Sequence, residues 1–242
     1  HGMTDLAYRL LLNEEYPGWL HEVKLGATTV WERWNSLDEN GRISSTGMNS
    51  LNHYSYGAVL EWIFRHVAGI DVTEQGPGGK MMRISPKVDH KLGSASAVYD
   101  SASGCYRCGW QIENGDQITV TITVPFGAKA QVILPYAPDS VYHDTDNPLF
   151  ETVENGICCV KAGQYTVTYK AASPLKKSYS VDSTLEDLLA EPAIRAFLSN
   201  MMEVDMIPDL AYGLTLRQAA EAFAGGVSAE QAQRLNVLLE EF

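Results

Sequence analysis

The chain has 242 residues, of which 45% are hydrophobic and 20% charged, and its formal net charge at pH 7 is −12. This composition is that of a globular protein with one large domain or two small ones, and it argues against a nucleic-acid partner, because phosphate binding requires clustered Lys and Arg. No apolar run approaches the roughly 20 residues needed to cross a bilayer, so we expect no membrane partner. The first residues are typical of an amphipathic helix and not of a signal peptide, which favours a cytoplasmic protein.

Residues 4–69 are expected to form helices joined by one long irregular segment. Leu6, Leu10 and Leu12 give the first helix an apolar face. The second helix is expected from about 54 to 67, with Gly69 as its C-cap and with much of its circumference buried through Val59, Leu60, Trp62, Ile63 and Val67. A polar loop of about 20 residues between two helices is uncommon in a compact domain and is often functional. Two helices cannot bury both faces and also shelter such a loop, so this segment is expected to be part of something larger.

Residues 78–171 have the pattern of a β-structure. Residues 117–124 alternate apolar and polar side chains, as a half-buried strand does, and two later stretches repeat the alternation. Asn114-Gly115 and Asn155-Gly156 are dipeptides that favour hairpin turns. Several short strands with regular turns predict an antiparallel β-sandwich of about eight strands.

Residues 183–242 return to a helical pattern. Three segments match the capping box, in which a hydroxyl residue is followed three positions later by Glu or Gln, namely Ser183–Glu186, Thr215–Gln218 and Ser228–Gln231. Pro192 is suited to the first position of a further helix. The pattern therefore predicts three or four short helices.

The four cysteines occur as two pairs, Cys105 with Cys108 and the adjacent Cys158 and Cys159. Two such pairs could form a zinc site. Adjacent residues of a strand point to opposite faces, however, so Cys158 and Cys159 can rarely bind one metal ion. Free thiols are therefore favoured over a zinc site or a disulfide, and no metal and no cofactor are expected.

The most unusual local feature is the block Trp31–Trp34, with the sequence WERW. A carboxylate between indoles is suited to sugar binding, because indole faces stack on the C–H faces of pyranoses while the carboxylate binds hydroxyls. Apolar surroundings can also raise the pKa of such a carboxyl. A buried tryptophan pair beside a surface Glu–Arg ion pair explains the same residues, and composition alone favours that second interpretation.

A second polar cluster, Met48–Tyr54 (MNSLNHY), brings amides, an imidazole and a phenol to the entry of the second helix. Asn52 could cap that helix and His53 could fill a gap, and for a lone histidine the structural role is the better explanation. Two clusters of sugar-compatible side chains on the same irregular segment nevertheless strengthen the case for sugar binding at each cluster. Motifs of serine hydrolases, zinc proteases, phosphate loops and dinucleotide sites are absent from the sequence.

Several blocks, together with their spacing, resemble the end of the catalytic domain of bacterial α-L-rhamnosidases: Tyr16–Trp19, Gly26–Trp34, Met48–Tyr54 and Gly57–Asp71. The sandwich resembles the C-terminal β-domain of the same family through Gly109-Trp110, Val124-Pro125 and Leu134-Pro135. The helical tail resembles an extension that some members carry.

The resemblance implies that the catalytic domain is an α/α toroid of six hairpins, of which this chain carries the last part. The expected fold class is therefore α+β in several segments. Residues 1–75 would be a remnant of the toroid, residues 76–181 an antiparallel β-sandwich domain, and residues 182–242 a helical extension.

The resemblance also implies hydrolysis of terminal α-L-rhamnosides with inversion, in which one carboxylic acid protonates the leaving oxygen and a second carboxylate activates water. Glu32 matches the general base of the family, and His53 matches a histidine that contacts rhamnose. Trp31, Trp34 and Asn52 are candidates for shaping or supporting the pocket. The expected partner is a rhamnose-containing glycoside or another carbohydrate.

The general acid of the family and most of its sugar-binding residues lie upstream, in toroid helices that are not among these residues. Glu22, Glu39 or Glu61 could replace the acid in principle, but nothing in the sequence places them. Since a general acid contributes about 10²–10⁴-fold, Glu32 alone is expected to leave little activity. Apolar surface should be exposed on the first two helices where toroid helices are missing, and such a surface could also form a homodimer.

Two other functions fit the residues. The chain could be a non-catalytic carbohydrate-binding or interaction module built on the sandwich, and its sugar binding would then be unaffected by Glu32→Gln. It could also be a small hydrolase with a rearranged site that acts on another glycoside or an ester, which would require a second titratable group near Glu32.

Overall fold

The computed structural model describes residues 2–38, 40–44, 47–74, 76–143, 147, 149, 152–201, 207–223 and 225–240. The chain divides into two compact units, residues 1–175 and 176–242, and each is considered by itself. The domain boundaries expected after residues 75 and 181 stay predictions. No helix within the described residues is both long enough and apolar enough to pass through a membrane.

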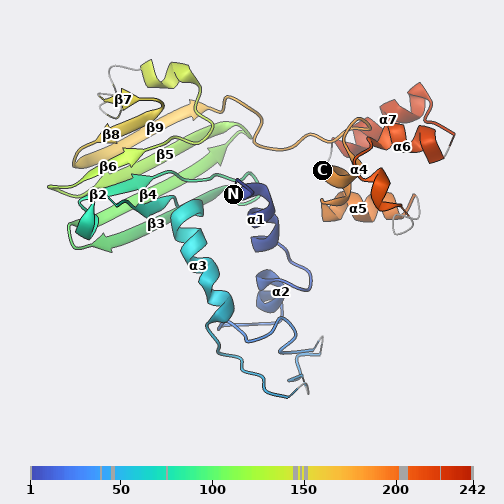
Figure 1. The fold of residues 1–242 in the computed structure, drawn as a ribbon, viewed down its shortest axis with the longest axis horizontal. Helices are drawn as coiled ribbons and strands as arrows, with labels where there is room; N and C mark the ends of the chain where they lie inside the picture. Colours follow the sequence, from blue (N-terminus) through green and yellow to red (C-terminus); the bar gives the residue numbers. More distant parts are fainter. Residues whose placement is uncertain are drawn as a thin grey trace. The chain divides into compact units, whose positions relative to one another are not determined.

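The first unit begins with helices, of which those labelled α1 and α3 adjoin a β-sandwich and α2 lies farther from it (Figure 1). The first two are α1 (Thr4–Leu11) and α2 (Trp19–Lys24). The helix expected from about 54 to 67 is a continuous helical segment of three parts: η1 (Ser55–Ala58), α3 (Val59–Trp62) and the π-helical turn η2 (Ile63–Val67). The C-cap is Ala68 and not Gly69 as predicted; Gly69 is the next residue and has a φ of 79°, the left-handed conformation that a glycine after a helix commonly adopts.

The expected burial of the second helix is wrong for Leu60 of α3, which is 57% exposed. Leu6 and Leu10 of α1 are exposed as well, in agreement with the apolar surface expected on the first helices. Only the faces that carry Tyr8 and Val67 are buried, because these are the faces that meet the sandwich core. Helical periodicity identifies an apolar face, but burial of that face requires a neighbouring element.

The strands form two sheets, which Figure 1 shows stacked on each other. One sheet has the order β1-β2-β6-β8-β7 and the other the order β3-β4-β5-β9. The bounds of the first sheet are β1 (Ile70–Val72), β2 (Met81–Ile84), β6 (Lys129–Val132), β8 (Ile157–Val160) and β7 (Val153–Glu154). Those of the second are β3 (Ser94–Ser101), β4 (Gly104–Glu113), β5 (Gln117–Val124) and β9 (Gly163–Lys170). Short 3-10 turns occur at η3 (Pro77–Gly79) and η4 (Asp139–His143).

The β-sandwich prediction is confirmed, with one addition to its topology. The described residues contain nine strands where about eight were expected, and the β2–β6 pair is parallel while the other strand pairs are antiparallel. The alternating residues of β5 behave as predicted, because Ile118, Val120, Ile122 and Val124 are all buried in the common core. Both Asn-Gly dipeptides form turns, with a φ of 53° at Asn114 and of 51° at Asn155.

The cysteine side chains lie as the strand pattern predicts. Cys158 is buried and Cys159 is exposed, so the two adjacent thiols point to opposite faces of β8. All four cysteines are free. In the described part of the chain, no group of three or more His, Cys, Asp and Glu side chains could hold a metal ion.

The first helices are attached to the sandwich by specific bonds. The indole of Trp110 on β4 donates a hydrogen bond of 2.7 Å to the carbonyl of Val67 at the end of the helical segment. The hydroxyl of Tyr8 donates to the carbonyl of Lys87, and its ring packs edge-on against Trp62 with a centroid distance of 5.3 Å. These contacts fix the orientation of α1 and α3 relative to the sandwich.

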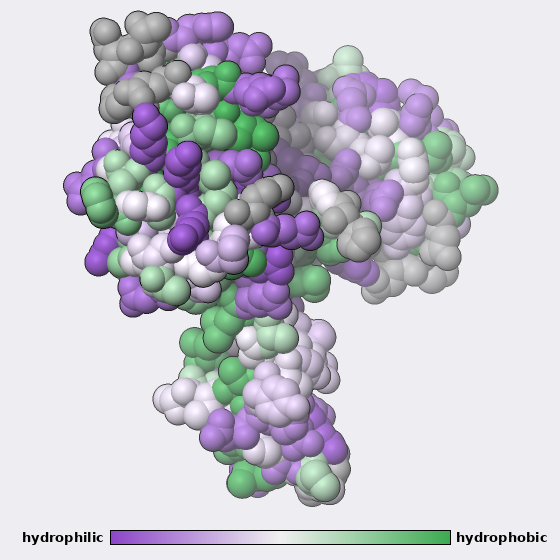
Figure 2. Space-filling model, turned by 60° about the vertical axis from the view of Figure 1, so that its left-hand side comes forward, coloured by the Kyte–Doolittle hydropathy of each residue, from purple (hydrophilic) through white to green (hydrophobic). Residues whose placement is uncertain are grey.

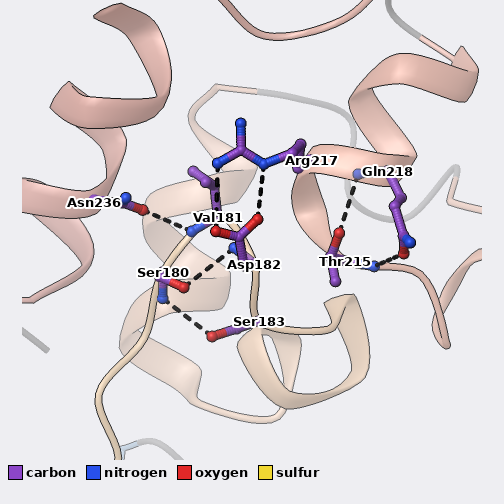
Figure 3. Close-up of polar contacts among 8 residues, drawn as sticks. All are labelled: Ser180, Val181, Asp182, Ser183, Thr215, Arg217, Gln218 and Asn236. Atoms are coloured by element: carbon purple, nitrogen blue, oxygen red, sulfur yellow. Dashed lines mark hydrogen bonds and ion pairs between the residues drawn. The ribbon is translucent and has the colours of Figure 1, made fainter. Parts of the chain in front are cut away.

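The second unit is a small helical bundle with its own core. Its helices are α4 (Leu185–Leu189), α5 (Pro192–Ser199), η7 (Asp209–Ala211), α6 (Leu216–Phe223) and α7 (Ala229–Leu239). Figure 3 shows how the segments that precede α4 and α6 are bound together. The N–H of Arg217 donates to the carbonyl of Val181 (2.9 Å), and its guanidinium binds the carboxylate of Asp182 (2.7 Å). Asn236 of α7 accepts the N–H of Val181 (2.8 Å).

The capping boxes at Thr215 and Ser228 are confirmed, since each hydroxyl and its partner Gln side chain exchange hydrogen bonds with the other residue's backbone. The box expected at Ser183 is displaced by one residue. Thr184 caps α4 instead, because the hydroxyl of Ser183 accepts the N–H of Ser180. Pro192 occupies the first turn of α5, as predicted.

We expect Ser228→Ala to lower the free energy of unfolding of the helical unit by about 1 kcal/mol, because an N-terminal N–H of α7 loses its acceptor. Urea denaturation followed by far-UV circular dichroism measures the change. All five tryptophans lie within residues 1–175, so tryptophan fluorescence should show no change in the first unit. Ser199→Ala is the control, since this exposed hydroxyl binds a carbonyl within its own helix and caps nothing. Equal effects of the two substitutions would contradict the prediction.

Candidate active site

The structure brings the two predicted site residues Glu32 and His53 onto adjacent segments of the first unit. The N–H of Glu32 donates to the carbonyl of Ser50 (2.9 Å), and the N–H of His53 donates to the carbonyl of Val30 (2.8 Å). The hydroxyl of Thr29 donates to the carbonyl of Leu51. The two sequence blocks identified above, WERW and MNSLNHY, are therefore joined along their backbones.

His53 is oriented by the turn that follows it. Its Nδ1 accepts the N–H of Ser55 at 3.2 Å, so in the neutral ring Nε2 carries the hydrogen and can donate it to a ligand. The ring stacks on Tyr54, with centroids 5.3 Å apart. The alternative role of Asn52 as a helix cap is wrong. The imidazole of His53, and not the side chain of Asn52, accepts the N–H of Ser55, the first residue of η1. Asn52 is exposed beside it.

Trp31 and Trp34 lie in different environments. Trp31 is 2% exposed, so its indole is buried and cannot stack on a sugar. Trp34 is half-buried and stacks on Tyr56, with ring centroids 3.9 Å apart and an interplanar angle of 7°. Trp19 packs edge-on against Trp34 at 5.1 Å and donates its indole N–H to the carbonyl of Tyr56 (3.1 Å). Trp19, Trp34 and Tyr56 therefore form one aromatic cluster. The assignment of Trp31, Trp34 and Asn52 to the pocket stays a prediction.

The carboxyls considered as substitutes for the general acid are not placed for that role. Glu61 is exposed and forms an ion pair of 2.6 Å with Arg65. Glu22 is 3% exposed, so a ligand cannot reach its carboxyl. Glu39 lies outside the described residues. Of the three carboxyls considered as substitutes, the two that the structure describes, Glu22 and Glu61, are therefore not suited to protonate a leaving group.

Hydrogen bonds between Ser36 and Asn49 join the two segments further, and the sequence did not mark Ser36 for this role. Ser36 is fully buried, and its hydroxyl donates to Oδ1 of Asn49 (2.6 Å) while Nδ2 of Asn49 donates to the carbonyl of Ser36 (2.9 Å). The same hydroxyl accepts the N–H of Arg33 at 3.2 Å. Asn49 belongs to the MNSLNHY block, but nothing in the sequence marks Ser36 as its partner.

Two family models match the chain. Residues 1–67 match the bacterial alpha-L-rhamnosidase 6 hairpin glycosidase domain, and residues 69–147 match the bacterial alpha-L-rhamnosidase C-terminal domain. The curated alpha-L-rhamnosidase of Alteromonas sp. (strain LOR) is 39% identical over 166 residues, which are 68% of this chain and 17% of that protein. The alpha-L-rhamnosidase of Streptomyces avermitilis is 36% identical over 163 residues, which are 67% of this chain and 15% of that protein.

Solved structures lead to the same family. The structure of the Streptomyces avermitilis alpha-L-rhamnosidase complexed with L-rhamnose aligns with a TM-score of 0.60 and 33% identity, over 70% of this chain and 16% of that chain. The native enzyme from Aspergillus terreus aligns with a TM-score of 0.58 and 28% identity, over 69% of this chain and 17% of that chain. This chain thus spans about a sixth of the length of the relatives it matches. It belongs to the bacterial α-L-rhamnosidase family and carries sequence from both its six-hairpin glycosidase domain and its C-terminal domain.

Proposed function

We propose that this chain supplies the general base, Glu32, and a rhamnose-binding histidine, His53, to an inverting α-L-rhamnosidase site. The observation that carries the proposal is the backbone pairing of the two segments that hold these residues, within the part of the chain that matches the six-hairpin domain. The relatives' names support a rhamnose-containing glycoside as the substrate.

In this mechanism, the carboxylate of Glu32 takes a proton from a water molecule as that water attacks the anomeric carbon. His53 donates a hydrogen bond from Nε2 to a hydroxyl of the sugar. A carboxylic acid about 6.5–9.5 Å from Glu32, on the other side of the sugar, must protonate the leaving oxygen. Neither Glu22 nor Glu61 suits that role. In this proposal the acid comes from further helices of the toroid.

The exposed apolar faces of the first helices support the proposal that further toroid helices complete the site. Leu6 and Leu10 of α1 are exposed, as are Leu60 and Phe64 of the helical segment, which agrees with the prediction made from the sequence. Figure 2 shows apolar surface on the part of the chain that extends below the sandwich. We propose that other helices of the toroid cover these side chains, and a second copy of the chain is the alternative occupant.

The proposal is tested with a chimera in which residues 1–175 replace the matching segment of the Streptomyces avermitilis α-L-rhamnosidase. The chimera should hydrolyse p-nitrophenyl α-L-rhamnoside, and His53→Ala should raise KM about tenfold, because a hydrogen bond to the sugar is lost. His143→Ala is the control, since this histidine lies in η4 of the sandwich. A folded chimera without activity, or an equal KM in the His53 variant, would refute the proposal.

A further inference from the structure

The outer face of the sheet that contains β3, β4 and β5 has a hollow of about 480 Å³. This volume lies within the range of about 300–1,000 Å³ that is usual for small-ligand sites. The inner faces of these strands fill the sandwich core with side chains such as Trp110, Val120 and Ile122. Since successive side chains of a strand point to opposite faces, the residues between them point outward. Those that line the hollow include Ser94, Ser96, Gly109, Gln111, Thr119 and Thr121.

Gly109 leaves the middle of this face without a side chain. The pairing of β4 is continuous on both sides, with Ser96 of β3 and Thr121 of β5 opposite Gly109, so the strand has no bulge at this point. The φ of Gly109 lies outside the left-handed region, so the backbone conformation does not require glycine here. Glycine inside a strand weakens the strand and often marks a place that a ligand approaches closely.

A side chain at residue 109 would occupy the hollow. An added Cβ would lie 2.9 Å from Oγ1 of Thr121 and 3.5 Å from Cβ of Ser96. The nearest atom is thus the hydroxyl of an exposed side chain, and residues that face each other across two strands ordinarily both carry side chains. Close packing therefore does not explain the glycine, which keeps the face open between Ser96 and Thr121.

The hollow offers hydroxyl and amide groups to a ligand. Ser94, Ser96 and Thr121 are exposed, and each hydroxyl can both donate and accept a hydrogen bond. The amide of Gln111 donates from Nε2 to the carboxylate of Glu113 at 3.0 Å, which leaves the amide oxygen as an acceptor. The lining is therefore polar on three neighbouring strands.

The same lining selects the class of ligand. The described residues that line the hollow include no Lys, Arg, His, Asp or Glu, so neither an anion nor a cation would find an opposite charge. Protein partners favour exposed aromatic side chains, Met and Arg, whereas the indole of Trp110 is turned into the core and binds the carbonyl of Val67. A neutral sugar presents hydroxyls that donate and accept in the same way as those of Ser and Thr.

We propose that this hollow is a binding site for a neutral sugar unit of a glycan, with Gly109 as its floor and the hydroxyls of Ser96 and Thr121 at its sides. The site holds a part of the glycan that takes no part in bond cleavage. The choice of a rhamnose-containing glycan rests on the proposed function, whereas the hollow and its uncharged lining do not. Residues 1–67, which carry Glu32 and His53, contribute nothing to it.

The test is a titration of the full chain with an α-linked L-rhamnose trisaccharide, followed by NMR of the backbone amides. The amides of Ser96, Gly109, Gln111 and Thr121 should shift and reach saturation. A trisaccharide of galacturonic acid is the anionic control and should bind more weakly. Shifts at His53 would report the candidate active site, so the positions of the shifted amides separate the two sites.

Three variants locate the binding. Gly109→Val fills the hollow with a side chain that suits a strand, and saturable binding should disappear. Thr121→Val removes one hydroxyl without changing the shape of the side chain, and the affinity should fall about threefold to tenfold. Thr166→Val is the matched control, because this exposed threonine faces Thr121 on β9 but does not line the hollow. Its affinity should equal that of the wild type.

Trisaccharide binding that leaves the amides of β3, β4 and β5 unchanged, or no binding at all, would overturn the proposal. Equal affinity in the wild type and Gly109→Val would overturn it as well, and tighter binding of the galacturonic acid trisaccharide would exclude the neutral class. If Gly109→Val does not fold, the comparison of Thr121→Val with Thr166→Val decides. These outcomes are independent of hydrolysis. An inactive chimera with intact binding at Gly109 would refute only the proposed function, and an active chimera without this binding would refute only the sugar site.

Discussion

Glu32→Gln should lower the rhamnosidase activity of the chimera about 10²–10⁴-fold, the usual contribution of a general base. Gln has nearly the same shape as Glu and still binds hydroxyl groups, but it cannot accept a proton from the attacking water. We therefore expect kcat to fall while KM changes little. Release of nitrophenol from p-nitrophenyl α-L-rhamnoside measures the loss, and NMR of the released sugar reports whether the anomeric configuration is inverted.

Glu61→Gln is the matched control, because it makes the same chemical change at an exposed carboxylate that pairs with Arg65. Its activity should equal that of the unmodified chimera. Full activity in Glu32→Gln would rule out the general base assigned here. The chain by itself should release little nitrophenol, and release that disappears in Glu32→Gln would mean that a second copy completes the site.

Gly69→Ala should lower the free energy of unfolding of the first unit by about 4 kcal/mol or more, a range reached only by severe backbone or core defects. Gly69 has a φ of 79°, and an added Cβ would lie 2.2 Å from the backbone nitrogen of Pro86. The Gly69 carbonyl accepts the N–H of Ser85, the residue before Pro86. This hydrogen bond holds the two backbone segments together, so neither can shift easily to relieve the clash. Urea denaturation followed by tryptophan fluorescence measures the change in this unit.

Gly93→Ala is the control that separates the effect of the steric clash at residue 69 from the effect of a positive φ alone. Gly93 has a similar φ of 75°, but an added Cβ would meet nothing within 4 Å. Its substitution should therefore cost only about 1–2 kcal/mol, the cost of a left-handed conformation for a residue with a Cβ. Similar losses in the two variants would show that the contact with Pro86 is not the cause.

The sandwich and the helix caps could be predicted because their signals are local. Strand β5 alternates along its own length, and the Asn-Gly turns need only their two residues to adopt positive φ. The capping box at Ser228 likewise involves residues within one turn. The predicted cap of α4 was wrong by one position, because another local hydrogen bond competes for the Ser183 hydroxyl. That hydroxyl accepts the N–H of Ser180, and Thr184 caps the helix.

The residues of the candidate site could be predicted from the sequence, but the contacts between them could not. Glu32 and His53 were identified from the blocks that hold them, but their adjacency depends on backbone bonds between segments about twenty residues apart. The burial of Glu22 could not be predicted, because a glutamate in a short helix is usually solvated.

The sequence by itself therefore determined the order of helical, sandwich and helical segments, the turns and caps within them, and the blocks that carry Glu32 and His53. The tertiary structure alone decided that β2 pairs in parallel with β6, that Leu60 is exposed, and that Glu22 is buried. The physical reason is the range of the interactions. Backbone conformation and capping depend on neighbours in the chain, whereas burial and strand pairing depend on which distant surfaces meet.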